Sequence, residues 1–287
     1  GGRISPEAME LVCGVLSGMA AIYRGLDVAG VRVVATSAVR DAGNQREFLD
    51  RAAAAAGAPV EVISGQEEAR LIHLGVESRW PHPNRRVLIV DLGGGSGEVI
   101  LAQDGKLAEA FSRPLGALRL NEAFLKSDPP APLELHRMDE YIEEKLAPAV
   151  RRIGAGGFDR AIVTSASAAA AVCAIHRVSR SRRDTADRLR AARAQMRRLF
   201  RDLCARDLAA RRRVPGIGPR RAEIIIPGVA VFLRVLEDFQ LPSIYYCSAG
   251  VRDGIVADLA ARGVGRERTH LDRDQRRVVE RMTRRYG

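Results

Sequence analysis

The chain has 287 residues, of which 46% are hydrophobic, and a formal net charge of +11, so it has room for two domains and a sizeable core. The positive charge favours a polyanionic partner such as polyphosphate, a nucleotide, nucleic acid or an acidic membrane surface, with a merely solvated arginine surface as the alternative. The four cysteines and five histidines show neither a disulfide framework nor a zinc-ligand spacing, which fits a reducing, cytoplasmic compartment. The longest weakly polar stretch, 161–175, is too short to span a bilayer, so no membrane association is expected.

The first part of the chain alternates helices and strands and then reaches a proline-containing break. A helix is predicted to begin at Pro6, because Ser5 is a good N-cap and proline suits the first helical position. The segment 80–84 contains two prolines and predicts a domain boundary. Between these points the pattern predicts a helix over 6–23, a strand over 31–35, a helix over 44–56, a strand over 60–63 and a helix over 65–79.

The rest of the chain continues the alternation after a glycine-rich hairpin. Asp104 and Gly105 are typical of a tight turn at the end of that hairpin. The pattern predicts a hairpin over 87–102, helices over 116–126 and 134–153, a strand over 161–163 with an alanine-rich helix after it, an arginine-rich helical region over 185–212, a helix over 219–239, a strand over 243–247, a helix over 250–262 and a lone charged helix over 272–286. Alternating strands and helices indicate an α/β fold.

The most informative segment is the turn between the two apolar runs of the hairpin. It consists of Gly93, Gly94, Gly95 and Ser96. Consecutive glycines let the backbone place N–H groups around an anion with no Cβ in the way. Asp91 and Glu98 flank the turn and could hold a divalent cation beside that anion. A phosphate-binding turn with carboxylates at its edges indicates phosphoryl chemistry.

A second candidate segment is the start of the helix over 65–79. Ser64 and Glu67 have the spacing of a capping box, which gives Glu67 a structural role. Glu68 lies about 100° further round the helix and is not explained by capping. The alternative for Glu68 is a solvated glutamate that the helix dipole favours in the first turn.

Small hydroxylated residues follow two of the predicted strands. Arg40 comes after the strand over 31–35 and suits bidentate pairing with phosphate, although a loop pair with Asp41 is the alternative. Ser165 and Ser167 follow the strand over 161–163, where helix N-terminal amides bind anions, and an ordinary N-cap is the alternative.

The arginine-rich region and the hairpin after it allow a nucleic-acid interpretation. A positive stripe at helical spacing is formed by Arg190, Arg193, Arg197 and Arg201. It would guide a long polyanion or form a solvated face. The segment 214–222 resembles the hairpin of helix-hairpin-helix DNA-binding motifs, but a simple helix connection explains so short a signature, and nucleic-acid binding is not expected.

Four segments together resemble the exopolyphosphatase/guanosine pentaphosphate phosphohydrolase family of the actin-like ATPase superfamily. They are VATSAVRDA (34–42), VISGQEEARLIHLGV (62–76), VLIVDLGGGSGEVIL (87–101) and SAGVRDGI (248–255). The resemblance implies a two-domain actin-like (ribonuclease H-like) α/β fold with an interdomain cleft. It also implies Mg²⁺-assisted hydrolysis of a terminal phosphoanhydride in polyphosphate or pppGpp.

The same resemblance assigns roles to individual residues. On the family's pattern Glu68 is the general base that activates water, and Asp91 and Glu98 hold the metal directly or through water. Phosphate contacts fall to Arg40, Gly93, Gly94, Gly95, Ser96, Ser165 and Ser167. Ala166 stands where the family's second phosphate turn, T-S-G-T, carries glycine.

The resemblance divides the chain into three parts. Residues 1–80 match a first actin-like domain without its N-terminal strand and D-x-G-S-N-S turn, 84–262 a second domain with the arginine-rich region, and 263–287 the start of a further helical domain. The leading hypothesis is a phosphohydrolase acting on polyphosphate or pppGpp. Because the first phosphate loop is not matched, a non-catalytic polyphosphate- or nucleotide-binding module is the alternative, followed by a nucleic-acid-binding protein. A homodimer is left open.

Overall fold

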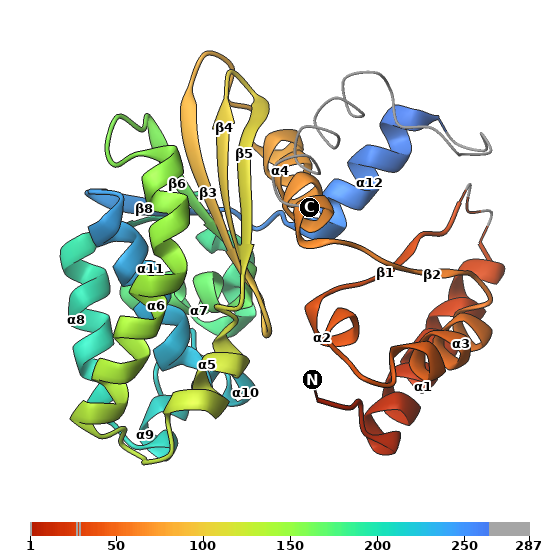
Figure 1. Cartoon of the computed structure of the whole chain (residues 1–287), viewed down its shortest axis with the longest axis horizontal. Helices are drawn as coiled ribbons and strands as arrows, with labels where there is room; N and C mark the ends of the chain where they lie inside the picture. Colours follow the sequence, from red (N-terminus) through yellow and green to blue (C-terminus); the bar gives the residue numbers. More distant parts are fainter. Residues whose placement is uncertain (1, 27, 29, 264–287) are drawn as a thin grey trace.

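The computed structural model describes residues 2–26, 28 and 30–263, which form a small and a large lobe (Figure 1). The predicted helix over 272–286 lies outside the described residues. Strands and helices alternate along the chain in both lobes, so the predicted α/β fold is confirmed. In the described part of the chain, no helix is both long and apolar enough to cross a membrane.

The small lobe pairs two short parallel strands and covers them with helices. Its elements are α1 (Pro6–Arg24), β1 (Val33–Ala35), α2 (Ser37–Arg40), α3 (Gln45–Ala56) and β2 (Val60–Val62). The α1 helix begins as predicted, because the Ser5 hydroxyl accepts a hydrogen bond from the N–H of Ala8 and proline occupies the first turn. Met9, Phe48 and Ala52 form the core between α1 and α3.

The large lobe is built on a six-stranded mixed sheet in the order β5-β4-β3-β6-β8-β7. The strands are β3 (Arg86–Leu92), β4 (Gly97–Gln103), β5 (Lys106–Arg113), β6 (Arg160–Thr164), β7 (Arg190–Ala192) and β8 (Ser243–Tyr246). The β3–β4–β5 meander is antiparallel, whereas β6 runs parallel to both β3 and β8. The predicted hairpin corresponds to β3 and β4, and together with β5 it forms one half of the sheet.

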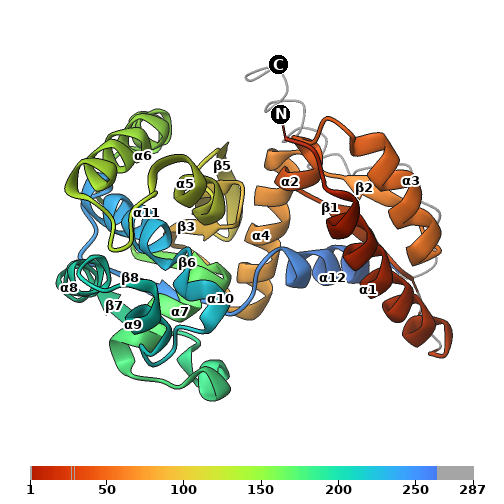
Figure 2. The ribbon, with the colours of Figure 1, turned by 90° about the horizontal axis from the view of Figure 1, so that it is seen from below.

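Helices cover both faces of this sheet. Alternate residues of β3 point to opposite faces, so that Leu88 and Val90 enter one core and Val87 and Ile89 the other. The first core is closed by α5 (Ala117–Phe124), α6 (Pro132–Ile153), α7 (Ser165–His176), α8 (Arg193–Cys204) and α11 (Ile225–Asp238). The second core is closed by α4 (Gly65–Arg79), and α12 (Val251–Arg262) packs along α4 between the lobes (Figures 1 and 2).

The arginine-rich region is not the continuous helical region that the sequence predicts. It contains the 3₁₀ helix η1 (Arg180–Ala186), the edge strand β7, α8 and α9 (Leu208–Arg212). Arg190 lies on β7 because 190–192 pair antiparallel with β8, and its Nε donates to the Ser243 hydroxyl. The predicted helical stripe is therefore wrong at Arg190 and is reduced to the three arginines on α8.

The predicted helix over 219–239 is also interrupted. It is divided into α10 (Pro219–Ala222) and α11, with Glu223 and Ile224 between them. Pro227 explains the break, because it has no N–H to donate to Glu223 and its ring would clash with that carbonyl in a continuous helix. Proline is tolerated in the first turn of α11, where no such bond is required.

Candidate active site

Strand register lines up four polar side chains across the large sheet. Asp91 on β3 is paired with Glu98 on β4 and with Thr164 on β6, and Glu98 is paired with Ser112 on β5. Because directly paired residues point to the same face, these side chains form one row, which we call the carboxylate row. The Thr164 hydroxyl donates to Asp91 Oδ1, and the Ser112 hydroxyl donates to Glu98 Oε1 at 2.8 Å.

The first turn of α4 lies over this row. A Cβ on Gly65 would come within 2.3 Å of the Ser112 Cβ, so only glycine lets the helix approach β5 this closely. This approach brings Glu68 next to the row, where it interacts electrostatically with Asp91 and Glu98. Glu68 is only 8% exposed and Glu98 is fully buried, which excludes a solvated first-turn glutamate at position 68.

The predicted capping box forms only in part. The Ser64 hydroxyl accepts from the Glu67 N–H at 3.1 Å, as expected. The Glu67 carboxylate instead receives two hydrogen bonds from Arg70, at 2.7 and 2.8 Å. Arg70 also pairs with the buried Asp258 of α12, which in turn pairs with Arg32 of the small lobe. These ion pairs hold α4 against α12 and the small lobe.

Burial raises the pKa values of all three carboxyl groups, and repulsion from neighbouring carboxylates adds to the shift at Glu68 and Glu98. The pKa of Glu98 lies well above its usual value because the group is buried and faces the charges of Glu68 and Asp91, while Ser112 and Ser96 oppose the shift. Burial raises the pKa of Glu68, an effect that Arg40 counters and Asp91 reinforces. Burial also raises the pKa of Asp91, opposed by the Thr164 hydrogen bond. Three close carboxyl groups therefore resist simultaneous ionisation.

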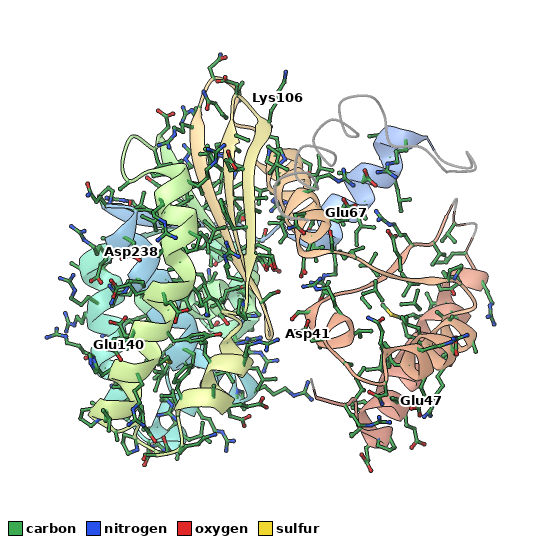
Figure 3. The ribbon with its side chains drawn as sticks, viewed as in Figure 1. Asp41, Glu47, Glu67, Lys106, Glu140 and Asp238 are labelled. Carbon is green, nitrogen blue, oxygen red and sulfur yellow. The ribbon has the colours of Figure 1, made fainter. Side chains whose placement is uncertain are left out.

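Arg40 lies beside Glu68, as the predicted site requires. Its Nη1 is 3.6 Å from Glu68 Oε2 and donates to the Ile63 carbonyl at 2.7 Å. The predicted alternative, a loop pair with Asp41, is not what the structure shows, because Asp41 pairs with Arg119 of the large lobe. Figure 3 shows Asp41 on the side of the small lobe that faces the large lobe, and Glu67 on the side of α4 that faces the small lobe.

A pocket of about 370 Å³ opens between the lobes beside the glycine turn. It is lined from the small lobe and α4 by Ser37, Arg40, Asp41, Ser64, Gly65 and Gln66, and from the large lobe by Gly95, Ser96, Ser112, Arg113, Pro114 and Arg119. A Cβ on Gly95 would lie 2.5 Å from the Ser37 hydroxyl oxygen, so this glycine permits the close approach of the two lobes. We call this cavity the inter-lobe pocket.

The turn itself offers fewer amide donors than predicted. The Gly93 N–H already donates to the Ser96 carbonyl at 3.0 Å, which closes the turn. The amides of Gly94 and Gly95 donate to no other residue in the described part of the chain. Arg119 supports the turn, because its Nε donates to the Gly95 carbonyl at 2.8 Å. Of the three glycine amides, those of Gly94 and Gly95 are therefore the ones available to a ligand, whereas the Ser96 side chain is hydrogen-bonded to Glu98.

Ser165 and Ser167 lie on the first turn of α7, at the end of the strand that carries Thr164. Ser165 has a φ of 99°, and its hydroxyl accepts from the Ala168 N–H, so it caps the helix. Ser167 is fully buried, and its hydroxyl accepts from Arg221 at 3.1 Å. Neither serine lines the inter-lobe pocket. The structure thus brings together Asp91 on β3, Glu98 on β4, Arg40 on α2 and Glu68 on α4. The two serines lie outside this group, after Thr164 in the chain.

The carboxylate row fits a magnesium ion that keeps several non-protein ligands. Glu68 Oε2 and Glu98 Oε2 are buried and have no hydrogen-bond partner within the described residues. Over the same residues, no group of three or more His, Cys, Asp or Glu side chains is arranged to enclose a metal by itself. Mg²⁺ is usually held by one or two carboxylates together with water and substrate phosphates, so a closed protein cage is not needed.

Four further residues of the site were not among the predicted ones. Ser112, Arg113 and Arg119 line the inter-lobe pocket, and Thr164 contacts Asp91. Thr164 follows a predicted strand, which is a usable signal. Nothing in the local spacing marks the other three, because they reach the site through strand pairing and through the docking of α5 on the glycine turn.

The fold and site define a two-lobed α/β protein with buried carboxylates beneath an arginine- and glycine-lined pocket. The chain belongs to the Ppx/GppA phosphatase family, whose model matches residues 1–262. Exopolyphosphatase 1 of Mycobacterium tuberculosis is 29% identical over 264 residues, which cover 89% of this chain and 74% of that protein. Exopolyphosphatase 2 of the same organism is 36% identical over 157 residues, which cover 53% and 49%.

Solved structures of relatives share this architecture. The Ppx/GppA family member of Aquifex aeolicus is 27% identical and has a TM-score of 0.79, covering 91% of this chain and 84% of that one. An exopolyphosphatase from Cytophaga hutchinsonii is 25% identical and has a TM-score of 0.83, covering 92% and 86%. The similarity therefore extends over both lobes.

Proposed function

We propose that this protein hydrolyses the terminal phosphoanhydride of inorganic polyphosphate, of pppGpp or of both. The observation that carries the proposal is the carboxylate row, with Glu68 above it, next to the inter-lobe pocket. The names of the exopolyphosphatase relatives support the substrate class. Arg40, Arg113 and Arg119 line the pocket, and guanidinium groups of this kind suit a phosphate chain.

In this proposal the protein's own residues divide the work between binding and proton transfer. The arginines and the amides of Gly94 and Gly95 hold the terminal phosphate and neutralise charge on its oxygens. Glu68 accepts the proton of the attacking water at Oε2, which has no hydrogen-bond donor within the described residues. A raised pKa makes Glu68 a stronger base once ionised, and Arg40 keeps an ionised population available.

Asp91 and Glu98 would hold Mg²⁺ at the sheet side of the pocket. The ion would supply positive charge that offsets the repulsion among the three carboxylates and the charge of the phosphate chain. Thr164 and Ser112 orient the two ligands through their hydrogen bonds to Asp91 and Glu98. Such supporting hydrogen bonds fix the direction in which a ligand oxygen points.

Phosphate release from polyphosphate and from pppGpp, measured with Mg²⁺ and with chelator, tests the proposal. We expect release only with Mg²⁺, and a fall in kcat of roughly 100- to 10,000-fold in Glu68→Gln with substrate binding retained. Glu10→Gln, an exposed glutamate on α1, is the matched control and should match the wild type. Binding of both substrates without any turnover by the wild type would instead support a non-catalytic binding module. Full activity in Glu68→Gln would refute the role of that residue.

A further inference from the structure

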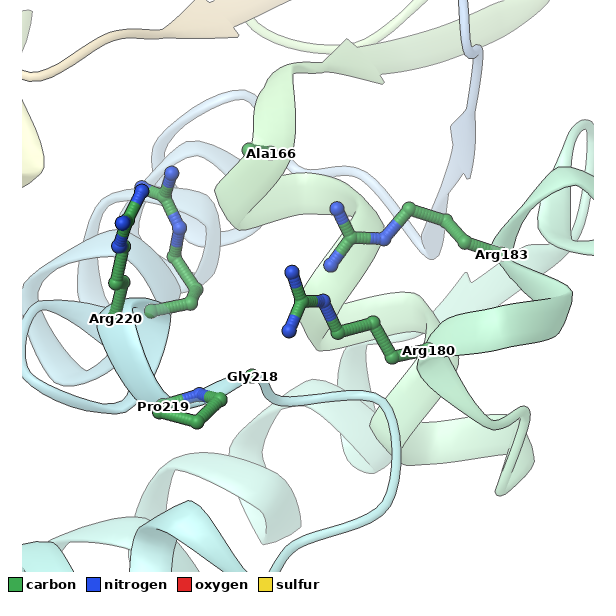
Figure 4. A pocket seen from close by; sticks show the side chains of 7 residues that line it. Ala166, Arg180, Arg183, Gly218, Pro219 and Arg220 are labelled. Carbon is green, nitrogen blue, oxygen red and sulfur yellow. The ribbon is translucent and has the colours of Figure 1, made fainter.

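A second pocket lies on the other side of the first turn of α7. It has a volume of about 470 Å³, and its walls come from η1, from the segment before α10 and from α10 itself (Figure 4). The residues that matter here are Arg180, Arg183, Arg220, Arg221, Gly218 and Ala166. We call this cavity the arginine pocket.

The arginine pocket concentrates positive charge without a compensating acid. Its lining contains four arginines and no carboxylate, and within the described residues none of the four forms an ion pair. The side chains of Arg180 and Arg183 extend from η1 towards the wall formed by α10 (Figure 4). Arg183 and Arg221 are half-buried, and unpaired guanidinium groups at such positions are costly unless an anion joins them.

Two observations show that the positive charge of this pocket is incompletely compensated. The Nε of Arg183 is buried and has no hydrogen-bond partner in the described part of the chain. The pKa of Arg221 is lowered by burial and by the neighbouring charge of Arg183. By contrast, the half-buried Arg234 is paired with Asp139, Glu143 and Asp238. The fold therefore pairs a half-buried arginine elsewhere and leaves this cluster open.

The pocket is linked to the carboxylate row through α7. Arg221 donates to the buried Ser167 hydroxyl at 3.1 Å, and Ala166 lines the pocket from the same turn. That turn directly follows Thr164, which donates to Asp91. Ser165 and Ser167, expected to contact phosphate from their own hydroxyls, thus lie between the carboxylate row and the arginine pocket.

The chemistry of the pocket fits a chain of phosphates better than one phosphate group. Four guanidinium groups offer more donors than a single phosphate can accept, and each pairs well with two phosphate oxygens. A pocket of about 470 Å³ also falls within the range of sites that hold ligands larger than a single ion. A linear polyphosphate supplies closely spaced negative charges of this kind.

We propose that the arginine pocket is a subsite for phosphate groups of a polyphosphate chain that lie away from the bond being cleaved. This inference rests on the proposed function, which places the terminal phosphate in the inter-lobe pocket. It predicts that long chains bind more tightly than short ones, because only long chains occupy both pockets. Arg180 and Arg183 then select for chain length and do not take part in catalysis.

Equilibrium binding of long-chain polyphosphate and of tripolyphosphate, without divalent cation, tests this subsite. The double variant Arg180→Gln/Arg183→Gln should bind the long chain roughly tenfold more weakly, because charge-assisted hydrogen bonds are lost, and tripolyphosphate within about twofold of the wild type. Arg220→Gln removes a guanidinium from the opposite wall and should show the same selective loss. Arg198→Gln/Arg206→Gln is the matched control, because it removes the same charge from exposed positions on α8 and just after it, outside the stripe of Arg193, Arg197 and Arg201.

The possible outcomes separate this subsite from the proposed function. If the pocket variant and the control lost the same affinity for long-chain polyphosphate, the loss would be a general effect of the removed charge, and the subsite would be refuted. An equal loss of affinity for tripolyphosphate would place these arginines at the reactive end of the chain, which would also contradict the subsite. Unchanged affinity for the long chain would show that the pocket does not bind it. If the wild type released no phosphate from any substrate, the proposed function would fail while the binding comparison still decided the subsite.

Discussion

The carboxylate row and the arginine pocket flank the same turn of α7 and carry opposite charges. The row crosses the four strands from β5 to β6, and their pairing fixes the position of each side chain. The arginine pocket is lined by η1 and α10, two short segments whose arginines form no ion pair among the described residues. Both regions hold like charges that a bound ion would neutralise. The difference indicates that the function of the carboxylate row depends on exact side-chain positions, whereas that of the arginine pocket depends on its positive charge.

After Glu68→Gln, the largest expected effect comes from Glu98→Gln, which tests whether the carboxylate row lowers the stability of the protein in favour of its function. This variant replaces a fully buried carboxyl group that interacts electrostatically with two other carboxyl groups. We expect phosphate release to fall by roughly 100-fold or more, since stabilisation of phosphate charge is lost. The metal-free protein should melt at a higher temperature than the wild type at pH 8, measured by calorimetry.

Ser112→Ala is a control that should change the melting temperature in the opposite direction. The Ser112 hydroxyl stabilises the ionised form of Glu98, so its loss should lower the metal-free melting temperature at pH 8. A Glu98→Gln variant that melted below the wild type would contradict the assignment of stored repulsion to the row.

A change at Gly65 tests whether exact geometry matters on the acidic side. Gly65→Ala places a Cβ 2.3 Å from the Ser112 Cβ, and α4 must move away from β5. We expect a loss of about 1–3 kcal/mol in the free energy of unfolding, together with reduced activity, from denaturant titration and phosphate release. Gly14→Ala, with no atom within 4 Å of the new Cβ on exposed α1, should instead stabilise the protein by up to about 1 kcal/mol. Equal stability of both variants would disprove the tight contact.

The pH dependence of stability provides a third comparison of the two regions. The folded pKa of Glu98 is raised above its ordinary value of 4.5, so the folded state binds more protons than the unfolded state above that pH. The penalty is absent below pH 4.5, grows as pH rises towards the folded pKa and is complete above it. Metal-free wild type should therefore lose about 1.4 kcal/mol relative to Glu98→Gln for each unit of raised pKa.

Denaturant titrations at a series of pH values would measure this difference. Saturating Mg²⁺ should remove most of it, because the ion binds the ionised carboxylates. Parallel pH curves for the wild type and Glu98→Gln would contradict the raised pKa. The stability of the arginine pocket variants should depend on pH in the same way as that of the wild type, since arginine does not titrate in this range.

The smallest effect is expected from Arg119→Gln at the rim of the inter-lobe pocket. Arg119 pairs with Asp41 across the lobes, but both side chains are substantially exposed, so the pair contributes at most about 1 kcal/mol. We expect KM to rise by roughly two- to fivefold, partly through the lost bond to the Gly95 carbonyl, with kcat nearly unchanged. A loss as large as that of Glu98→Gln would show that the rim, and not the row, dominates the site.

Local patterns were enough to predict most of the elements and the chemical type of the site. Helix α4 was predicted with its observed bounds, and α1 within one residue, because caps and periodicity are local signals. The strand β7 was missed because its partner β8 lies some fifty residues further along the chain, and nothing between 185 and 212 marks a strand. Pairing over such distances is invisible to local propensity.

The same reasoning explains which site residues were predicted. Glu68, Asp91 and Glu98 lie in segments with a recognisable pattern, and the structure brings them together. Ser112 joins them only through the register of β4 with β5. The engaged amide of Gly93 also depends on the closed shape of the turn, which composition does not determine.

The account depends most directly on a shared protonation of Glu68, Asp91 and Glu98 that a cation displaces. Calorimetric titration of Mg²⁺ near pH 7, in buffers of different ionisation enthalpy, measures the protons released on binding. We predict net proton release by the wild type and a clearly smaller release by Glu98→Gln, because metal-bound carboxylates are ionised. Mg²⁺ binding with no proton release, and with no difference between the two proteins, would contradict the account.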